Sequence, residues 1–158
     1  MDAIEYLTDQ HHEIESLFDQ IESAARTKTK LRLRRKLFDL LAVHMALEER
    51  IFYPAARDAG VKELLLGALV EHLSVERIIA ELVEVDEVYA EAAKMSLLEK
   101  RKKQHASAEE RELFPRVREL LGPFQLEVLG RRMASVADQL MGPGVGARER
   151  VTARRALA

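Results

Sequence analysis

Hydrophobic residues recur every three or four positions along most of this chain, which is the spacing of one buried face of an α-helix. The first such stretch starts with a capping signal at Asp2 and covers residues 2–25. A polar break at residues 26–30 separates it from a second stretch over residues 33–60. Pro54 should kink or end the last turn of this second helix, because proline lacks the amide hydrogen that a helix interior requires. This part of the chain therefore predicts a helical hairpin.

Three further helices are predicted in the rest of the chain. A third stretch, with Leu73 in its apolar stripe, covers residues 62–89. A capping signal at residues 96–99 starts a fourth helix, which a Gly-Pro pair stops. A fifth, shorter helix should follow over residues 124–141. The remaining residues, 142–158, hold turn residues and arginines without a sustained apolar period, so we expect a flexible tail.

The polar residues of the two halves match when the sequence is shifted by 61 positions. The apolar stripe follows the same shift, so both halves are predicted to form the same helical hairpin. Two such hairpins can bury their apolar faces against each other as an up-down antiparallel four-helix bundle. We therefore expect an all-α fold, with residues 1–141 forming one domain that ends in the short fifth helix. The matched positions are His11 and His72, Glu15 and Glu76, His44 and His105, Glu48 and Glu109, and Pro54 and Pro115.

Two of the matched histidines are each followed four residues later by a glutamate, so each pair lies on one helix face about one turn apart. His44 continues the apolar stripe of its helix, which directs its ring and the carboxylate of Glu48 toward the core. A buried carboxylate needs a compensating charge, and no Lys or Arg obviously points inward to supply it. A lone histidine on an apolar face is usually a hydrogen-bonded core residue, but the joint pattern favours a metal ion bound by imidazoles and carboxylates.

The segments 9–14 and 44–49, with their counterparts at His72 and His105, resemble the hemerythrin-like, or HHE cation-binding, family over roughly residues 3–120. The resemblance implies a non-haem centre of two iron ions, bridged by two glutamates and by an oxo or hydroxo group, with the histidines terminal. The first two histidines would bind one iron and the other two the second iron. Manganese or zinc would also suit such ligands. The implied metal ligands are His11, His44, Glu48, His72, His105 and Glu109.

This chain departs from the oxygen-carrying members of the resembled family at two positions, with Glu76 in place of a histidine and Glu109 in place of an aspartate. Loss of that histidine opens a coordination position or substitutes an oxygen donor, which makes reversible dioxygen carriage less favoured than turnover or sensing. Glu15 and Glu76 are candidate partners for imidazole N–H groups, and Glu76 is the better candidate for a direct ligand. Tyr53 is a candidate hydrogen-bond donor to the site, although a core aromatic ahead of Pro54 is the commoner explanation.

Charge and composition narrow the possible partners. The chain carries 25 Lys and Arg against 27 Asp and Glu, a formal net charge of −2, so no bulk field draws it to nucleic acid or an anionic membrane. The basic runs at 32–36 and 100–103 are expected to be solvated, and surface salt bridges are expected for Glu49 and Glu110. There is no cysteine, so metal donors must be nitrogen or oxygen atoms. No apolar stretch is long enough to span a membrane, and we expect a cytoplasmic protein that is monomeric or weakly self-associating.

The first functional hypothesis is an enzyme-like di-iron centre that reacts with hydrogen peroxide or dioxygen, with a catalase-like activity in oxidative-stress defence. The alternative is a non-enzymatic module that senses or stores oxygen, nitric oxide or iron. A third possibility, iron donation for iron–sulfur cluster repair, resembles another branch of the family, but that branch carries a cysteine-bearing segment that this chain lacks. The residues alone leave open whether the chain is an enzyme.

Overall fold

The computed structural model describes residues 1–84 and 88–142, and these residues are almost entirely helical, with no β-strand among them. The predicted all-α fold is therefore confirmed. The tail expected at 142–158 lies, from residue 143 on, outside the described residues. The helices are α1 (Ala3–Ser23), α2 (Thr27–Leu47), α3 (Tyr53–Asp58), α4 (Glu63–Glu84), α5 (Val88–Ala108), α6 (Phe114–Leu120) and α7 (Pro123–Met141), with two π-helical turns, η1 (Glu48–Phe52) and η2 (Glu109–Leu113).

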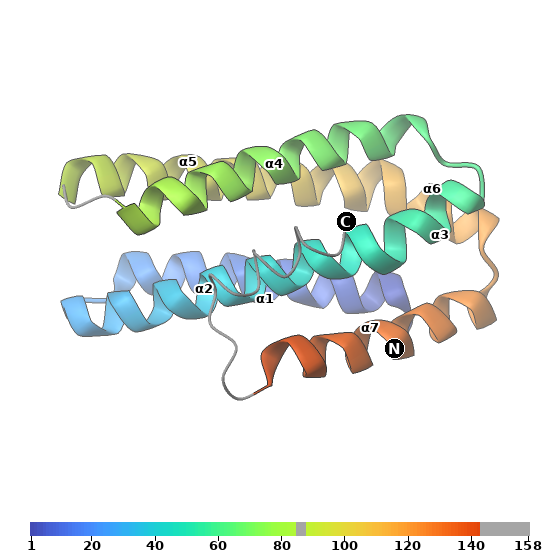
Figure 1. Cartoon of the computed structure of the whole chain (residues 1–158), viewed down its shortest axis with the longest axis horizontal. Coiled ribbons are helices and arrows are strands. Elements are labelled where there is room, and N and C mark those ends of the chain that lie inside the picture. The colour runs from blue at the N-terminus through green and yellow to red at the C-terminus, as the bar shows by residue number, and fades with distance from the viewer. Residues whose placement is uncertain (85–87, 143–158) are drawn as a thin grey trace.

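Two antiparallel hairpins, α1 with α2 and α4 with α5, lie against each other and form the bundle (Figure 1). The short helices α3 and α6 continue α2 and α5 at one end of the bundle. Helix α7 then runs back along the outer side of the first hairpin, where it contacts both α1 and α2. The predicted bundle with an additional C-terminal helix is confirmed, although α7, with 19 residues, is nearly as long as the bundle helices.

The hydrophobic core is divided into two clusters by a layer of polar residues. One cluster includes Leu7 and Phe52, and the other includes Leu17 and Leu41. In each bundle helix a buried histidine lies where the chain passes from one cluster to the other, as His11 does between Leu7 and Leu17. Burying polar groups in the middle of a core is costly unless they are paired, so this layer needs a specific explanation.

The start of α1 agrees with the sequence pattern. The Asp2 carboxylate accepts hydrogen bonds from the amides of Ile4 and Glu5 at 2.8 and 2.9 Å, and the Glu5 carboxylate accepts one from the Asp2 amide at 2.8 Å. This reciprocal pair is the predicted capping box. Helix α2 begins at Thr27, inside the break expected at 26–30, and it has no side-chain cap.

The boundary between the third and fourth helices differs from the prediction. The helix expected over residues 62–89 ends at Glu84, and α5 begins well before the capping signal at 96–99. That capping assignment is wrong because Glu99 lies within α5. Its carboxylate pairs with the Lys103 ammonium one turn later, at 2.7 Å, as charged residues commonly do along an exposed helix face.

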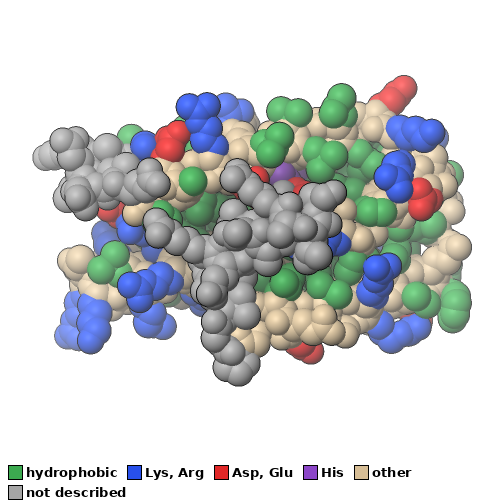
Figure 2. All heavy atoms as spheres, in the orientation of Figure 1, with side chains coloured by type: hydrophobic (Ala, Val, Ile, Leu, Met, Phe, Trp, Pro, Cys, Tyr) green, Lys and Arg blue, Asp and Glu red, His purple; other side chains and the backbone are tan. Residues whose placement is uncertain are grey.

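The outward side of α4 exposes large hydrophobic residues, seen as green side chains along the upper part of Figure 2. Leu66, Val70 and Leu73 are 58–70% exposed, so the expectation that Leu73 belongs to the buried stripe is wrong. Leu65, Ile79 and Leu82, which belong to the same predicted stripe, are buried. Because this helix carries apolar residues on several sides, their spacing alone does not show which side is buried.

Candidate metal centre

Six polar side chains meet between the two hydrophobic clusters. Helices α1, α2, α4 and α5 each contribute one histidine, and the turns η1 and η2 each contribute one glutamate. None of the six is more than 6% exposed. The structure therefore brings together every residue that the sequence indicated as a ligand. These residues are His11, His44, Glu48, His72, His105 and Glu109.

The donor atoms form two overlapping groups, and within each group they lie within 4.8 Å of one another. Glu48 belongs to both groups, since its Oε1 lies 3.2 Å from His44 Nε2 and its Oε2 lies 3.0 Å from His72 Nε2. Two ligands bound at right angles to one ion, each at about 2.1 Å, would be about 3.0 Å apart, so this spacing suits an ion between them. The groups are His11, His44, Glu48 and Glu109, and Glu48, His72 and His105.

The carboxylate of Glu109 is turned differently from that of Glu48. Its Oε2 lies 3.4 Å from His11 Nε2 and 3.3 Å from His105 Nε2. Its Oε1 accepts a hydrogen bond from the Tyr53 hydroxyl at 2.7 Å. Glu48 thus presents one oxygen to each pair of histidines, whereas Glu109 presents a single oxygen to both pairs.

Five buried donor atoms of this centre have no hydrogen-bond partner among the described residues: Nε2 of His11 and of His44, both carboxylate oxygens of Glu48, and Oε2 of Glu109. Burial raises the pKa of Glu48, but the neighbouring imidazoles, His44 first among them, outweigh burial and lower that pKa well below its usual value. An ionised carboxylate without a donor is very costly in an apolar core. Cations bound between the imidazoles and carboxylates would satisfy all five atoms, so the residues present fit a metal centre.

Each imidazole is held through its other ring nitrogen by an oxygen on a neighbouring helix or turn. When Nδ1 donates its hydrogen to that oxygen, the Nε2 of a neutral imidazole carries none and its lone pair can face a metal ion. The four acceptors obey the 61-residue repeat, since Gln10 matches Glu71 and Glu49 matches Glu110. The pairs are His11 with Glu110 at 2.7 Å, His44 with Gln10 at 3.1 Å, His72 with Glu49 at 2.7 Å and His105 with Glu71 at 2.6 Å.

These acceptors differ from those that the sequence suggested. Glu49 and Glu110, for which only surface salt bridges were expected, each lie against a histidine of a neighbouring helix. Glu15, a candidate partner of an imidazole, instead lies 3.7 Å from the Lys103 ammonium with its side chain 55% exposed. Glu76 is partly buried and lies outside both donor groups. The repeat could have pointed to the true acceptors, because they too recur at the same offset.

Each central glutamate opens a π-helical turn that is followed by an aromatic residue and a proline. The amide of Tyr53 donates to the carbonyl of Glu48 five residues earlier, and the amide of Phe114 donates to that of Glu109. The next residue is proline, which lacks an amide hydrogen and whose ring clashes with the preceding turn, so a wider turn is favoured. In an α-helix the aromatic residue would lie about 140° around from the glutamate. The wider turn brings both side chains to the same side.

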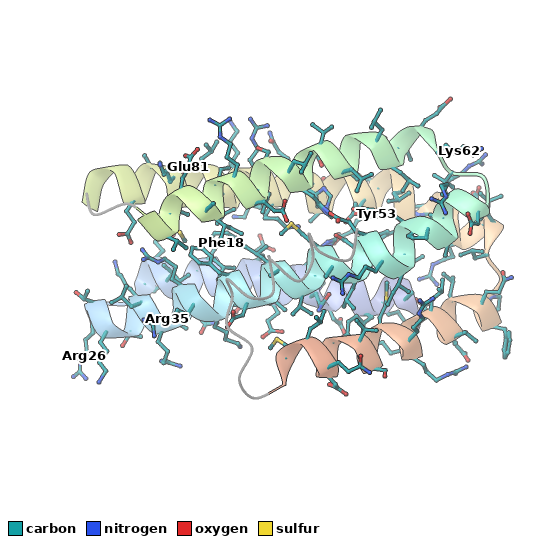
Figure 3. The ribbon with its side chains drawn as sticks, viewed as in Figure 1. Phe18, Arg26, Arg35, Tyr53, Lys62 and Glu81 are labelled. Atoms are coloured by element: carbon teal, nitrogen blue, oxygen red, sulfur yellow. The ribbon has the colours of Figure 1, made fainter. Side chains whose placement is uncertain are left out.

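Tyr53 lies at the start of α3 and is directed into the bundle (Figure 3). Its ring stacks on that of His72 with centroids 5.6 Å apart, and its hydroxyl lies 3.3 Å from His72 Nε2. Phe114 stacks on His11 at 5.9 Å but has no hydroxyl. Burial, together with the charges of the two central glutamates, raises the pKa of Tyr53 far above its usual value. The phenol therefore keeps its proton and donates it to the hydrogen bond with Glu109.

A buried lysine lies beside the centre, which corrects the expectation that no Lys or Arg points inward. Lys102 is 2% exposed, and its Nζ has no hydrogen-bond partner among the described residues. Burial lowers the pKa of Lys102, while the charges of Glu48, Glu109 and Glu71 act in the opposite direction. The residue 61 positions earlier is Leu41, a fully buried core residue, so the repeat carried a signal that Lys102 faces inward.

The fold and these buried donors define a helical-bundle protein with a metal-binding centre built from imidazoles and carboxylates. The family model of the hemerythrin HHE cation binding domain matches residues 2–117, and the chain belongs to this family. The structure is similar to the crystal structure of a hemerythrin HHE cation binding domain-containing protein, an Rv2633c homologue from Mycobacterium kansasii. The TM-score is 0.79 at 25% sequence identity, and the match covers 99% of this chain and 92% of that chain.

No curated protein matches the chain at a significant level. Across the part of the chain that the structure describes, no helix combines the length and the apolar character needed to cross a membrane.

Proposed function

We propose that this chain is a non-haem di-iron protein that reacts with hydrogen peroxide or dioxygen, with a catalase-like decomposition of peroxide as its activity. The observation that carries the proposal is the position of the Glu48 carboxylate, which presents one oxygen to His44 and the other to His72. A carboxylate shared in this way can hold two ions close together. Two adjacent redox-active ions, when bound, supply the pair of electrons that peroxide chemistry requires.

The chemistry of the donors supports iron. Nitrogen and oxygen donors without a thiolate suit iron or manganese, and zinc has no redox chemistry to offer. Three of the four imidazoles donate their Nδ1 hydrogen to a carboxylate, which makes them stronger donors and favours a higher oxidation state of the ion. In this proposal His11 and His44 would hold one ion, His72 and His105 would hold the other, and Glu48 and Glu109 would serve both.

Tyr53 and Glu109 supply the proton chemistry in this proposal. Two molecules of hydrogen peroxide give two of water and one of dioxygen, so the protons released by one molecule must reach the other. The Glu109 carboxylate can take up such a proton, and the Tyr53 hydroxyl, 2.7 Å from Glu109 Oε1 and 3.3 Å from His72 Nε2, holds that carboxylate oxygen beside the donor atoms. The hydrophobic clusters on both sides of the layer restrict the entry of water.

The proposal is tested on protein purified from iron-replete cells. We expect about two irons per chain and repeated release of dioxygen when hydrogen peroxide is added. His44→Ala and Glu109→Ala should lose both the iron and the activity, because each removes a buried donor. Glu112→Ala is the matched control, since Glu112 is an exposed glutamate of the same turn as Glu109 and lies outside both donor groups. It should keep the iron and the activity.

The outcomes separate the candidate functions. Two irons without release of dioxygen would favour a module that senses or stores oxygen, nitric oxide or iron. A wild-type chain that takes up no metal would contradict the di-iron assignment itself. Equal loss of iron in the Glu112 control and in the Glu109 variant would show that the assay reports general damage to the fold.

A further inference from the structure

Lys102 places a positive charge in the core beside the metal centre without a partner. Its side chain is 2% exposed, and Nζ forms no hydrogen bond or ion pair with any described residue. An ammonium group that leaves water without gaining a partner is strongly disfavoured. A group of opposite charge that is not part of the chain would explain why the lysine is tolerated.

Packing alone does not call for a lysine at this position. In the first half of the repeat the equivalent residue is Leu41, which is fully buried in the core. A leucine therefore fills the corresponding space without any charge. Only the second half of the repeat has an ammonium group at this position. Lys102 lies about one helical turn before His105 on α5.

Lys102 lines a pocket of about 380 Å³ whose walls come from α1, α5 and η2. The walls also include His11 and Glu110, which form one of the hydrogen-bonded pairs of the centre. Phe18, labelled in Figure 3, also lines the pocket, as do the exposed charged residues Glu15, Lys103 and Arg111. A water molecule takes up about 30 Å³, so the pocket has room for a small anion with several waters. A molecule that enters this pocket can therefore contact both Lys102 and His11.

The charges around the centre favour entry of an anion. Five carboxylates either belong to the donor groups or accept a hydrogen bond from an imidazole, and together with the Lys102 ammonium they balance two divalent ions. Without the Lys102 ammonium the same two divalent ions would leave one negative charge in excess, which would repel an anion; with it, two divalent ions leave none and two trivalent ions would leave two positive charges in excess. The five carboxylates are those of Glu48, Glu49, Glu71, Glu109 and Glu110.

We propose that Lys102, together with the ion held by His11 and His44, binds a small monovalent anion of the size of hydroperoxide that enters through this pocket. The inference rests on the proposed metal centre, because the bound ion provides the second positive charge. The anion would give Nζ the partner that it lacks. Lys102 is then the residue that sets the preference of the centre for anionic over neutral ligands.

The test uses cobalt(II) as the metal and azide as the anion, because the visible spectrum of bound cobalt reports both binding steps. Lys102→Leu copies the residue of the first half and should weaken azide binding on the order of tenfold, the effect of removing one unit charge at short range in a protein interior. The same change should tighten cobalt(II) binding, because it removes a like charge. Lys102→Arg should keep most of the azide affinity. Lys100→Leu is the matched control, since this exposed lysine of α5 lies outside the pocket lining, and it should change neither affinity.

The opposite signs of the two effects distinguish an electrostatic role from damage to the fold, which would weaken both affinities. Lys102→Met serves as a second variant if the leucine protein does not fold, because it keeps an unbranched side chain. Cobalt(II) binding with an azide affinity that is independent of residue 102 would overturn this inference alone. A chain that takes up no cobalt(II) would overturn the proposed metal centre and this inference with it.

Discussion

The hydroxyl of Tyr53 should stabilise the metal-free protein more than the metal-loaded protein. It donates to Glu109 Oε1 at 2.7 Å, while the other oxygen of that carboxylate has no hydrogen bond among the described residues. A hydrogen bond to a charged group is worth about 1.5–3 kcal/mol. At this chain length 1 kcal/mol shifts the melting temperature by about 2–4 °C, so Tyr53→Phe should lower that of the metal-free protein by about 3–12 °C.

The same substitution should cost less once metal is bound, because the ions neutralise the Glu109 carboxylate directly. The assay is thermal unfolding, followed by circular dichroism, of wild type and Tyr53→Phe with and without iron. Tyr6→Phe is the control, since Tyr6 is a partly buried tyrosine packed against the same hydrophobic cluster as Tyr53. Its melting temperature should change little and equally in both states.

Two results would refute this reasoning. An equal fall in melting temperature for Tyr53→Phe with and without iron would show that the hydroxyl does not act on the charge of Glu109. A fall of the same size in Tyr6→Phe would show that the loss of any buried hydroxyl has this effect.

Other predictions concern the packing of α7, the outer partners of the imidazoles and the pH dependence of metal binding. Gly130→Ala should be about 1–3 kcal/mol less stable than Gly67→Ala in thermal unfolding, because its Cβ would lie 2.7 Å from a main-chain oxygen at the N-terminus, whereas Gly67 faces open space. Glu110→Gln should weaken iron binding about 10- to 100-fold in a chelator competition, because Glu110 holds His11 through Nδ1. Burial lowers the pKa values of His11 and His72, but neighbouring carboxylates outweigh burial and raise both above their usual value. Protons must therefore leave before metal binds, and iron affinity, measured by the same competition, should fall as the pH falls from about 8 to 6.

Each of these predictions has a contrary outcome. Equal stability of the two alanine variants would show that the N-terminus moves away from α7 at no cost. Glu112→Gln, an exposed glutamate of the same turn, is the control for Glu110→Gln, and equal effects of the two changes would argue against a role through His11. An iron affinity that is constant over this pH range would show that neither imidazole carries a proton in the metal-free protein.

The six central residues could be found from the sequence because the repeat compares the register of two halves and does not depend on where helices begin. A helix boundary was missed between α4 and α5, where residues 85–87 contain neither glycine nor proline. The repeat was insensitive to this error, since His72 and His105 are matched to residues of the first half wherever α4 ends and α5 begins. Their role as ligands stays a prediction.

The residues around the centre were harder to predict, because their contacts depend on the direction in which each side chain points around its helix axis. A π turn changes that rotation, so the geometry of a regular α-helix does not describe Tyr53 correctly. Lys102 is one of four consecutive basic residues, and composition does not show which of them is buried. The repeat does show it, because Lys102 matches Leu41, a residue of the apolar stripe. Positions at which the two halves differ were therefore informative as well as those at which they are identical.

The two halves of the repeat differ most clearly where they approach the centre. Around His72 and His105 both acceptors of Nδ1 are carboxylates and a tyrosine hydroxyl is present, whereas His44 is paired with a neutral amide. The pocket and the unpaired ammonium lie instead on the side of His11. One side therefore has the stronger donors and a phenolic proton, and the other has access from solvent and a positive charge. Two ions in such surroundings are chemically inequivalent, which suits a centre that admits a small oxidant on one side and handles protons on the other. The differing pairs are Gln10 and Glu71, Leu41 and Lys102, and Tyr53 and Phe114.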